Sequence, residues 1–271
     1  MSTKGVYTAL SGAIAQSQRL DTIANNLANV NTPGFKRDQQ LFREFLTANE
    51  RPAEVIQVPR IPASIESFYD MQGGDKSYVD SNGTYTDFSQ GGLRPTGNHL
   101  DVALDGKGFF EIATPAGMRM TRHGAFSLDG NGTLVTRDGF PVMSEGVPGQ
   151  DPATRRIQTT GGSLTITDNG DVLEENKKIG RLSVVEVEKK ENLQKVGNNL
   201  YNFRADVLPE STVVQNPSLR QGYVEVSNVK IVKEMTDMIA ASRVFESTQK
   251  AISAYDSMTE KLVNQVPKTS G

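Results

Sequence analysis

The residues in this sequence that are best suited to chemistry are two histidines and a few acids next to glycine. His99 and His123 stand apart beside turn residues, and the chain has no cysteine, so we predict no metal-binding cluster. Asp105-Gly106-Lys107-Gly108 lacks the third glycine of a dinucleotide-binding loop and precedes Phe109-Phe110, which has strand composition. We interpret the histidines as surface or structural residues and the glycine segment as a turn.

The segment Asp129-Gly130-Asn131-Gly132 has part of the composition of a calcium loop but lacks its spaced carboxylates and its closing glutamate. It is typical of a hairpin turn. The sequence also has no Gly-x-Ser-x-Gly, His-Glu-x-x-His or P-loop pattern. We therefore predict a protein that is not an enzyme, with no catalytic residue, metal, cofactor or small-molecule substrate.

The remaining polar chemistry is hydrogen bonding by asparagine amides near the N-terminus. Asn25, Asn26 and Asn29 are poor helix formers, yet the apolar rhythm of Leu27 and Val30 continues through them. One interpretation is that the amides fray the end of a helix. The other is that Asn25 and Asn29, one turn apart, hydrogen-bond across a helix interface and fix its register, as buried amides do in coiled coils.

An amphipathic helix from Val6 to Val30 must position these amides, because apolar residues recur there at intervals of three and four. Thr32-Pro33-Gly34 ends it, and we expect a joint at Thr32, Pro33, Gly34 and Phe35. The assembly interface predicted on this helix consists of Val6, Leu10, Ala13, Leu20, Ile23, Asn25, Asn26, Leu27, Asn29 and Val30.

A second, longer helix is predicted near the C-terminus, where the apolar period is about 3.5 residues, the period of a coiled coil. Ser227 or Asn228 can cap its start and Pro267 stops it, so it runs for about 35 residues at 1.5 Å per residue. The assembly interface predicted on this helix consists of Ile231, Met235, Met238, Phe245, Ile252, Tyr255 and Leu262. We expect it to pair with residues 6–30 as a coiled coil and with helices of other copies.

The middle of the chain has short apolar runs separated by turn signals. Asparagine or aspartate precedes glycine in each signal, and such pairs tolerate positive φ in tight hairpins. The signals are Asn82-Gly83, Asp129-Gly130, Asn131-Gly132, Asp138-Gly139 and Asn169-Gly170. The runs have strand length at residues 102–104, 109–112, 125–128, 133–135, 164–166 and 182–187. We predict an all-β antiparallel middle domain, as a sandwich or barrel.

The predicted fold class is therefore α+β, with long N- and C-terminal helices that pair as a coiled coil around an all-β antiparallel domain. Residues 1–34 and 223–271 form the terminal helical domain, residues 35–80 form a connecting segment, and residues 81–222 form the β domain. Prolines at positions 52, 59 and 62 preclude a continuous helix after Leu46. We interpret residues 47–80 as an extended surface excursion.

Composition excludes several classes of partner. The 271 residues carry a net charge of −3, and the lysines and arginines are scattered, so nucleic acid is not a predicted partner. No apolar stretch reaches the ~20 residues of a membrane span, and the start leads into an amphipathic helix instead of an apolar signal core. We expect neither membrane insertion nor a cleavable signal peptide. The absence of cysteine leaves the compartment open.

Residues 24–36 resemble the flagellar rod and hook family, the axial proteins of the bacterial basal body. They match its N-terminal signature, ANNLAN-x-x-T-x-GFK, at every fixed position. Further matches lie at residues 96–98, 100–110, 121–126, 132–139 and 221–229, followed by Glu234-Met235 and Met238-Ile239. The sequence departs from the family pattern at His99, Met120 and His123, all outside the terminal helices. Within the family it most resembles the proximal-rod branch, then the distal-rod branch, and third the hook.

The resemblance implies a structural subunit that polymerises helically with its own copies and sibling rod proteins and transmits motor torque across the periplasm. Terminal helices would form an inner tube and β domains the outer wall. The resemblance also implies delivery by the flagellar type III export apparatus. Phe42 and Leu46 are similar to the element that early substrates present to the export gate, or they belong to an amphipathic turn packed on the β domain. One alternative is an enzyme or ligand-binding β domain with helical oligomerisation arms, which would need converging polar groups that the sequence does not offer. Another is an adhesin-like or peptidoglycan-binding module, testable by a cell-wall pull-down with residues 80–222.

Overall fold

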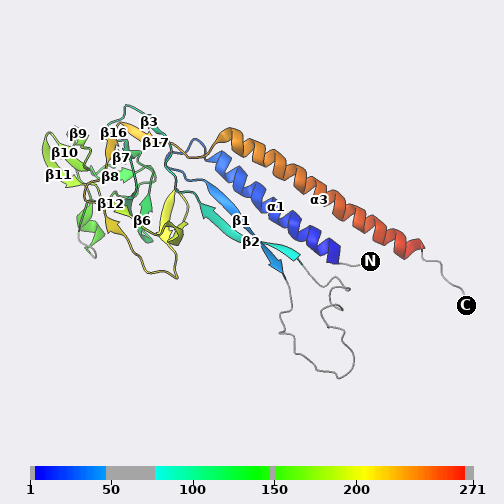
Figure 1. The fold of residues 1–271 in the computed structure, drawn as a ribbon. Coiled ribbons are helices and arrows are strands. Elements are labelled where there is room, and N and C mark those ends of the chain that lie inside the picture. Colours follow the sequence, from blue (N-terminus) through cyan, green and yellow to red (C-terminus); the bar gives the residue numbers. More distant parts are fainter. Residues whose placement is uncertain (1–3, 47–76, 147–149, 266–271) are drawn as a thin grey trace, which may run out of the picture. The chain divides into compact units, whose positions relative to one another are not determined.

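The computed structural model describes residues 4–46, 77–146 and 150–265. Helix α1 (Lys4–Ala28) lies near the N-terminus and helix α3 (Ile231–Gln265) near the C-terminus, and the strands lie between them in the sequence (Figure 1). This order confirms the α+β class. No helix in the described part of the chain is long and apolar enough to cross a membrane.

The chain divides into two compact units. The first contains Met1–Asn25, Gln39–Tyr85 and Val232–Gly271, and the second contains Asn26–Asp38 and Thr86–Ile231. The polypeptide therefore crosses between the units four times, after residues 25, 38, 85 and 231.

Helix α1 of the first unit buries few of its apolar side chains. Ala13, Ala15 and Ile23 are buried, whereas Leu10 and Ile14 are exposed. The side-chain Nε2 of Gln40 donates a hydrogen bond to Gln18 Oε1 at 3.1 Å, which connects the helix to the strand that follows it. The predicted interface residues of this helix thus include both buried and exposed side chains.

Helix α3 is 35 residues long, which confirms the predicted length. Its least exposed positions repeat every three or four residues, as expected for one face of a helix. These positions are Glu234, Asp237, Met238, Ala241, Ser242, Phe245, Thr248 and Ile252. Three of them belong to the predicted stripe, whereas Ile231, Met235 and Tyr255 of that stripe are exposed and the side chain of Leu262 lies outside the described residues. Coiled-coil pairing of α1 with α3 stays a prediction.

Strands β1 (Asp38–Leu46) and β2 (Ser77–Thr86) form a two-stranded sheet. Phe42 and Leu46 therefore lie on a strand, and the alternative of an amphipathic turn was wrong. The Asn82-Gly83 signal was also wrong as a hairpin turn, because it lies inside β2. Glycine carries a positive φ of 95° there, which a strand tolerates at an irregular position. Most of the predicted excursion, residues 47–76, lies outside the described residues.

The second unit is built from short antiparallel strands, which confirms the all-β middle domain. Its strands are β3 (Leu93–Pro95), β4 (Val102–Leu104), β5 (Phe109–Thr114), β6 (Gly117–Thr121), β7 (Phe126–Leu128), β8 (Leu134–Thr136), β9 (Leu164–Ile166), β10 (Asp171–Glu174), β11 (Lys177–Arg181), β12 (Val184–Glu186), β13 (Leu193–Lys195), β14 (Leu200–Phe203), β15 (Thr212–Val213), β16 (Leu219–Gln221) and β17 (Tyr223–Glu225). Short 3₁₀ turns occupy Pro152–Arg155 and Lys190–Asn192.

These strands form several small sheets. The largest has the order β13-β14-β6-β5-β12-β15, a second has the order β11-β10-β9, and three pairs join β16 to β4, β17 to β3 and β7 to β8. Pairing therefore connects strands that are far apart in the sequence, such as β3 with β17. The ladders are short, and the described strands of the unit form these separate sheets. They do not form one continuous sheet of a sandwich or barrel.

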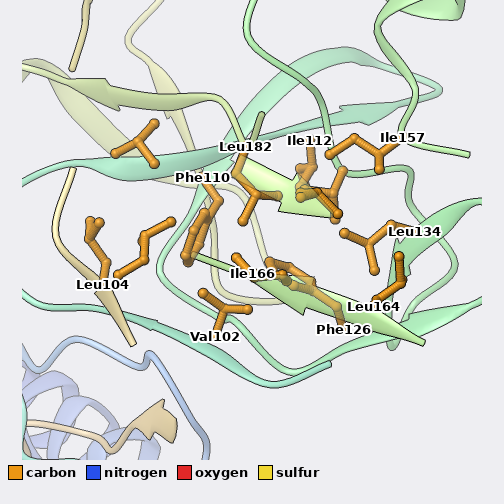
Figure 2. Close-up of a cluster of buried hydrophobic side chains, with 14 of the residues drawn as sticks. Val102, Leu104, Phe110, Ile112, Phe126, Leu134, Ile157, Leu164, Ile166 and Leu182 are labelled. Atoms are coloured by element: carbon orange, nitrogen blue, oxygen red, sulfur yellow. The ribbon is translucent and has the colours of Figure 1, made fainter. Parts of the chain in front are cut away.

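The second unit has two hydrophobic clusters on opposite faces of β5. Phe110 and Ile112 point into the larger cluster, whereas Phe109 belongs to the smaller one, as expected for neighbours on a strand. The larger cluster contains Val102, Leu104, Phe110, Ile112, Phe126, Leu134, Ile157, Leu164, Ile166 and Leu182 (Figure 2). The smaller cluster contains Phe109, Met120, Val185, Val187, Leu193 and Tyr201. Each such side chain contributes roughly 1.5–3 kcal/mol by its burial.

The turn predicted at residues 129–132 joins β7 to β8, as expected. The Asp129 carboxylate accepts hydrogen bonds from the amides of Asn131 and Thr133 at 2.9 and 2.7 Å. These bonds lower the pKa of Asp129. The carboxylate thus closes a hairpin turn.

Candidate functional site

The joint predicted at Thr32–Phe35 lies directly after α1. The helix ends at Ala28, and tighter turns follow, in which the amides of Asn29 and Val30 bond to carbonyls three residues back. The regular helix therefore ends two residues before the predicted Val30, and it begins two residues before the predicted Val6. Gly34 then adopts a φ of +70°, in the left-handed region that favours glycine. We call residues 32–38 the joint segment.

Asn26 connects the end of α1 to the end of the joint segment. Its Nδ2 donates to the carbonyl of Asp38 at 2.8 Å, and its Oδ1 accepts from the amide of Asp38 at 2.9 Å. The side chain of Asn26 is only 1% exposed. Its side-chain amide pairs with the backbone of Asp38 in its own chain, so the interpretation that these amides merely fray the helix end was wrong for Asn26. The proposed register role of Asn25 and Asn29 stays a prediction.

Lys36 forms a buried ion pair with Glu225 of β17. Its Nζ lies 2.5 Å from Glu225 Oε1 and donates to the carbonyl of Ser89 at 2.7 Å. Burial lowers the pKa of Lys36, and the negative charge of Glu225 opposes that shift. The amide of Gly91 also donates to Glu225 Oε1, at 2.8 Å.

Arg122 completes this ion cluster by pairing with the other oxygen of the Glu225 carboxylate. Its Nη1 lies 3.4 Å from Glu225 Oε2, and its Nη2 donates to the carbonyl of Gly106 at 2.5 Å. The guanidinium lies over the ring of Phe109 at 5.5 Å, and burial lowers its pKa. Two buried cations thus share the carboxylate of Glu225, so loss of that carboxylate leaves both without their common counter-charge.

The backbone of the joint segment lies against the β domain without room for a side chain at Gly34. The Gly34 amide donates to the carbonyl of Glu225 at 2.8 Å. A Cβ built on Gly34 would lie 2.6 Å from the backbone of Arg122 and His123. Glycine at position 34 is therefore required both by its φ and by this close approach.

The other side of the joint segment is held by the hairpin of β13 and β14. Lys195 Nζ donates to the carbonyl of Lys36 at 2.5 Å and to Asp38 Oδ2 at 2.7 Å, and it lies 4.0 Å from the centre of the Phe35 ring. Asn199 Nδ2 donates to the carbonyl of Pro33 at 3.2 Å. The hairpin tip thus binds residues at both ends of the segment.

Three of the four chain crossings meet at Asp38. Asn26 and Asp38 begin and end one stretch of the second unit, and Thr86 begins the next. Thr86 Oγ1 donates to Asp38 Oδ1 at 2.7 Å, while Asn26 binds the Asp38 backbone. The fourth crossing follows Asn228, whose Oδ1 accepts from the amide of Arg37 at 2.7 Å. Hydrogen bonds to the joint segment thus hold the polypeptide close to the points where it leaves the second unit.

This bonding of Asn228 differs from its predicted role as a cap at the start of the C-terminal helix. Asn228 binds the amide of Arg37 and the carbonyl of Asp87, and Ser227 Oγ accepts a hydrogen bond from the amide of Val229. These side chains therefore organise the chain that leads to α3, and the helix itself begins only at Ile231. Reasoning from the sequence found the joint but not Lys195, Asn199 or Asp38 as its partners. The residues Gly197, Asn198 and Asn199, which adopt positive φ values, were a turn signal that could have pointed to this hairpin.

The terminal segments of the chain match known family descriptions. Residues 6–36 match "Flagella basal body rod protein" and residues 220–266 match "Flagellar basal body rod FlgEFG protein C-terminal". Residues 103–174 match "Flagellar hook protein FlgE/F/G D1 domain". The matched segments therefore cover both terminal helices and part of the β domain.

Whole-length relatives agree with these matches. The chain is 33% identical to the flagellar basal-body rod protein FlgG of Bacillus subtilis, over 96% of this chain and 98% of the relative. The chain belongs to the flagellar basal-body rod family. It is also 30% identical to the rod protein FlgF of Caulobacter vibrioides, over 97% and 98% of the two chains. The resemblance stated above is confirmed at the level of the family.

In this rod protein, the ion cluster draws one residue from each matched segment: Lys36 from the first, Arg122 from the second and Glu225 from the third. Lys195 and Asn199 lie between the second and third matched segments. The three charged residues of the ion cluster thus lie in segments that match the family descriptions, whereas the hairpin residues Lys195 and Asn199 do not. The relatives carry both the FlgG and the FlgF names.

Proposed function

We propose that the chain is a non-enzymatic structural subunit that polymerises helically through its terminal helices and transmits motor torque in the rod. The observation that supports this most strongly is the exposure of large apolar side chains on both helices. Val232, Met235 and Ile239 of α3 are exposed, Val232 by 80%, and so are Leu10 and Ile14 of α1. Burial of apolar area yields roughly 25 cal/mol per Å², so these surfaces gain stability when other helices cover them.

The spacing of these side chains fits helix packing. Val232, Met235 and Ile239 follow one another at intervals of three and four, and Leu10 and Ile14 are four residues apart. These side chains therefore form a short apolar patch on each helix that a neighbouring helix could cover. The occupants we propose are the terminal helices of further copies and of sibling rod proteins, because the family is named for a rod and a rod is a repeated assembly.

Single charged substitutions on these stripes test the assembly role. Met235→Asp and Ile14→Asp alter exposed side chains, so the monomer should keep its fold while rods fail to form in cells that carry the variant as their only copy. Gln249→Asp is the matched control, since Gln249 is an exposed polar residue of α3. Normal motility and normal basal bodies in both stripe variants would rule out the terminal helices as the assembly surface.

We propose the proximal rod as the location of this subunit in the periplasm, with the distal rod or the hook as the alternative. The length of the chain and its C-terminal segment, Met238 to Glu246, support the proximal branch. Relatives named FlgG and FlgF are about equally similar to the chain. Reconstruction of purified basal bodies, with the β domain fitted into the density, would decide between the base and the tip of the rod.

We also propose that the subunit is delivered through the flagellar type III export apparatus, without a cleavable signal peptide, and that Phe42 and Leu46 present the gate element. Phe42 is 41% exposed on β1, so its removal should disturb the folded chain little. The Phe42→Ala variant should therefore fold normally but be secreted poorly, with Leu41→Ala, also exposed, as the control. Normal secretion of Phe42→Ala would remove the gate role.

A further inference from the structure

The joint segment is held by two sets of contacts that differ in burial. The inner set belongs to the ion cluster, in which the side chains of Lys36 and Glu225 are 1% and 0% exposed. The outer set includes the pair of Lys195 and Asp38, whose side chains are 21% and 17% exposed. Water and salt reach the outer pair more readily, so it is screened more than the inner one.

The outer set is carried on the tip of an edge hairpin. β13 is the terminal strand of the six-stranded sheet and pairs only with β14, and β14 pairs with β6 through Leu200 and Tyr201. Tyr201 is fully buried and packs on Phe109 with ring centres 5.5 Å apart. Leu193, at the base of the hairpin, and Tyr201, which pairs with Lys195 next to the turn, both belong to the smaller hydrophobic cluster, whereas the side chains of Lys195 and Asn199 rest on the joint segment.

The backbone of this tip is strained. Gly197, Asn198 and Asn199 follow one another with φ values of 89°, 48° and 56°. The left-handed region is unfavourable for residues with a Cβ, although asparagine tolerates it better than most. In this conformation Asn199 reaches the carbonyl of Pro33, and its own carbonyl accepts from Thr121 Oγ1 at 3.0 Å. The contacts of Asn199 and Lys195 thus offset the strain of the turn.

We propose that residues 195–199 form a latch on the joint segment, which opens as a local unit while the base of the hairpin and the larger hydrophobic cluster stay folded. When the latch is closed, Lys195 and Asn199 bind Pro33, Lys36 and Asp38, and the chain crossings at Asn26, Asp38 and Thr86 are fixed. When it is open, the joint segment keeps only the inner ion cluster, and its chain can adjust. This device goes beyond the proposed role in the rod and is a property of the isolated chain.

Hydrogen exchange of the full chain tests the latch. The amides of Arg37 and Asp38 in the joint segment donate to the side chains of Asn228 and Asn26 and report the opening of the segment. The amide of Leu134 donates to the carbonyl of Ile157 in the β domain and serves as the reference. In Lys195→Met, we expect exchange at Arg37 and Asp38 to quicken by about tenfold, with no change at Leu134, because contacts to a charged group are lost only from the closed state. Lys178→Met, which removes a surface ion pair with Asp171, is the matched control.

A second pair of variants separates the amide of Asn199 from the strain of the turn. Asn199→Gly removes the bond to Pro33 and relieves the left-handed backbone, and Asn198→Gly relieves it equally but keeps that bond. We expect faster exchange at the joint only in Asn199→Gly. The latch is overturned if both variants behave alike, or if Leu134 exchanges as much faster as Arg37 does.

The salt dependence of hydrogen exchange tests the latch in the unmodified chain, where no substitution can cause a folding defect. Raising the salt concentration from about 0.1 M to 1 M shortens the Debye length from about 10 Å to 3 Å and weakens the pair of Lys195 and Asp38. Exchange at Asp38 should then quicken relative to Leu134, and equal changes at both amides would contradict the latch. These measurements need no assembled rod, so their failure would leave the proposed function untouched.

Discussion

Lys36 and Glu225 are 189 positions apart in the sequence, yet the lysine Nζ lies 2.5 Å from the carboxylate in a site that excludes solvent. Arg122 shares the same carboxylate. The relationship joins the segment that follows α1 to the segment that precedes α3 within the second unit. Because burial of a charge is costly unless the charge is paired, this cluster holds only when all three segments are in place.

Glu225→Gln should destabilise the protein by about 3–5 kcal/mol, because Lys36 and Arg122 would stay buried without their counter-charge. Urea unfolding measures this change. Glu186→Gln is the control, since Glu186 lies 3.9 Å from a largely exposed Lys107 and should change the free energy of unfolding by less than about 1 kcal/mol. Equal effects of the two substitutions would contradict the central role of Glu225.

Gly34→Ala should destabilise the protein by more than Gly97→Ala. Both glycines have a positive φ, 70° and 73°, so alanine costs roughly 1–2 kcal/mol of backbone strain at either position. Only at Gly34 would the new Cβ also meet backbone, at 2.6 Å, whereas nothing lies within 4 Å at Gly97. The difference in thermal unfolding midpoint between the two variants therefore measures the close approach of the joint segment, and no difference would speak against it.

Asn26→Leu should destabilise the protein by about 1–3 kcal/mol, because the amide and carbonyl of Asp38 would lose their buried partners. Asn25→Leu, at an exposed neighbouring position, is the control for folding of the monomer. Asn29→Leu addresses the other hypothesis. If the Asn29 variant and the Asn25 control assemble normally, neither amide fixes the register between helices of different copies.

Acid should weaken the β domain through Glu174. Hydrogen bonds from Thr159 and the amide of Gly162 lower the pKa of Glu174 to about 2. The folded pKa lies below the ordinary value of 4.5, so this contribution is complete above pH 4.5 and is lost as the pH falls towards 2. Glu174→Gln should be less stable at pH 7, and its stability should fall less steeply between pH 5 and pH 2.

Unfolding by urea at a series of pH values checks the role of Glu174. Glu175→Gln is the matched control, because Glu175 is the exposed neighbour of Glu174 in the chain. An unchanged pH profile in Glu174→Gln would show that the carboxylate does not carry this acid sensitivity.

A dilute monomer should have less helix than α1 and α3 together would give. Their exposed stripes gain no burial without partners, and isolated helices are marginal when tertiary contacts are few. Circular dichroism at decreasing protein concentration measures the helix content, and limited proteolysis should cut the helices before the β domain. Full helix content in the dilute monomer would contradict the prediction.

Local patterns in the sequence were sufficient for much of the fold. The apolar spacing between Val6 and Val30 predicted α1, and the period after Ile231 predicted α3 with its length of 35 residues. Short β-branched and aromatic runs such as Phe109–Ile112 predicted the strands of the middle domain. These features depend on neighbours a few residues away, so the period of the side chains is enough to reveal them.

Local signals failed where a distant segment decided the outcome. Asn82-Gly83 has the chemistry of a hairpin turn, but it lies within β2. Phe42 and Leu46 lie on a strand because β2, some forty residues later in the chain, pairs with β1. Asn26 binds Asp38 rather than a residue of its own helix.

The sequence by itself determined the helices, six strands of the β domain, the hairpin turn at Asp129 and membership of the rod family. Only the tertiary structure decided which charges meet: Lys36 with Glu225 and Arg122, and Lys195 with Asp38. The physical reason is that an ion pair has no period along the chain. Its partners are chosen by the folding of the whole β domain, which brings together Lys36, after α1, and Glu225, before α3.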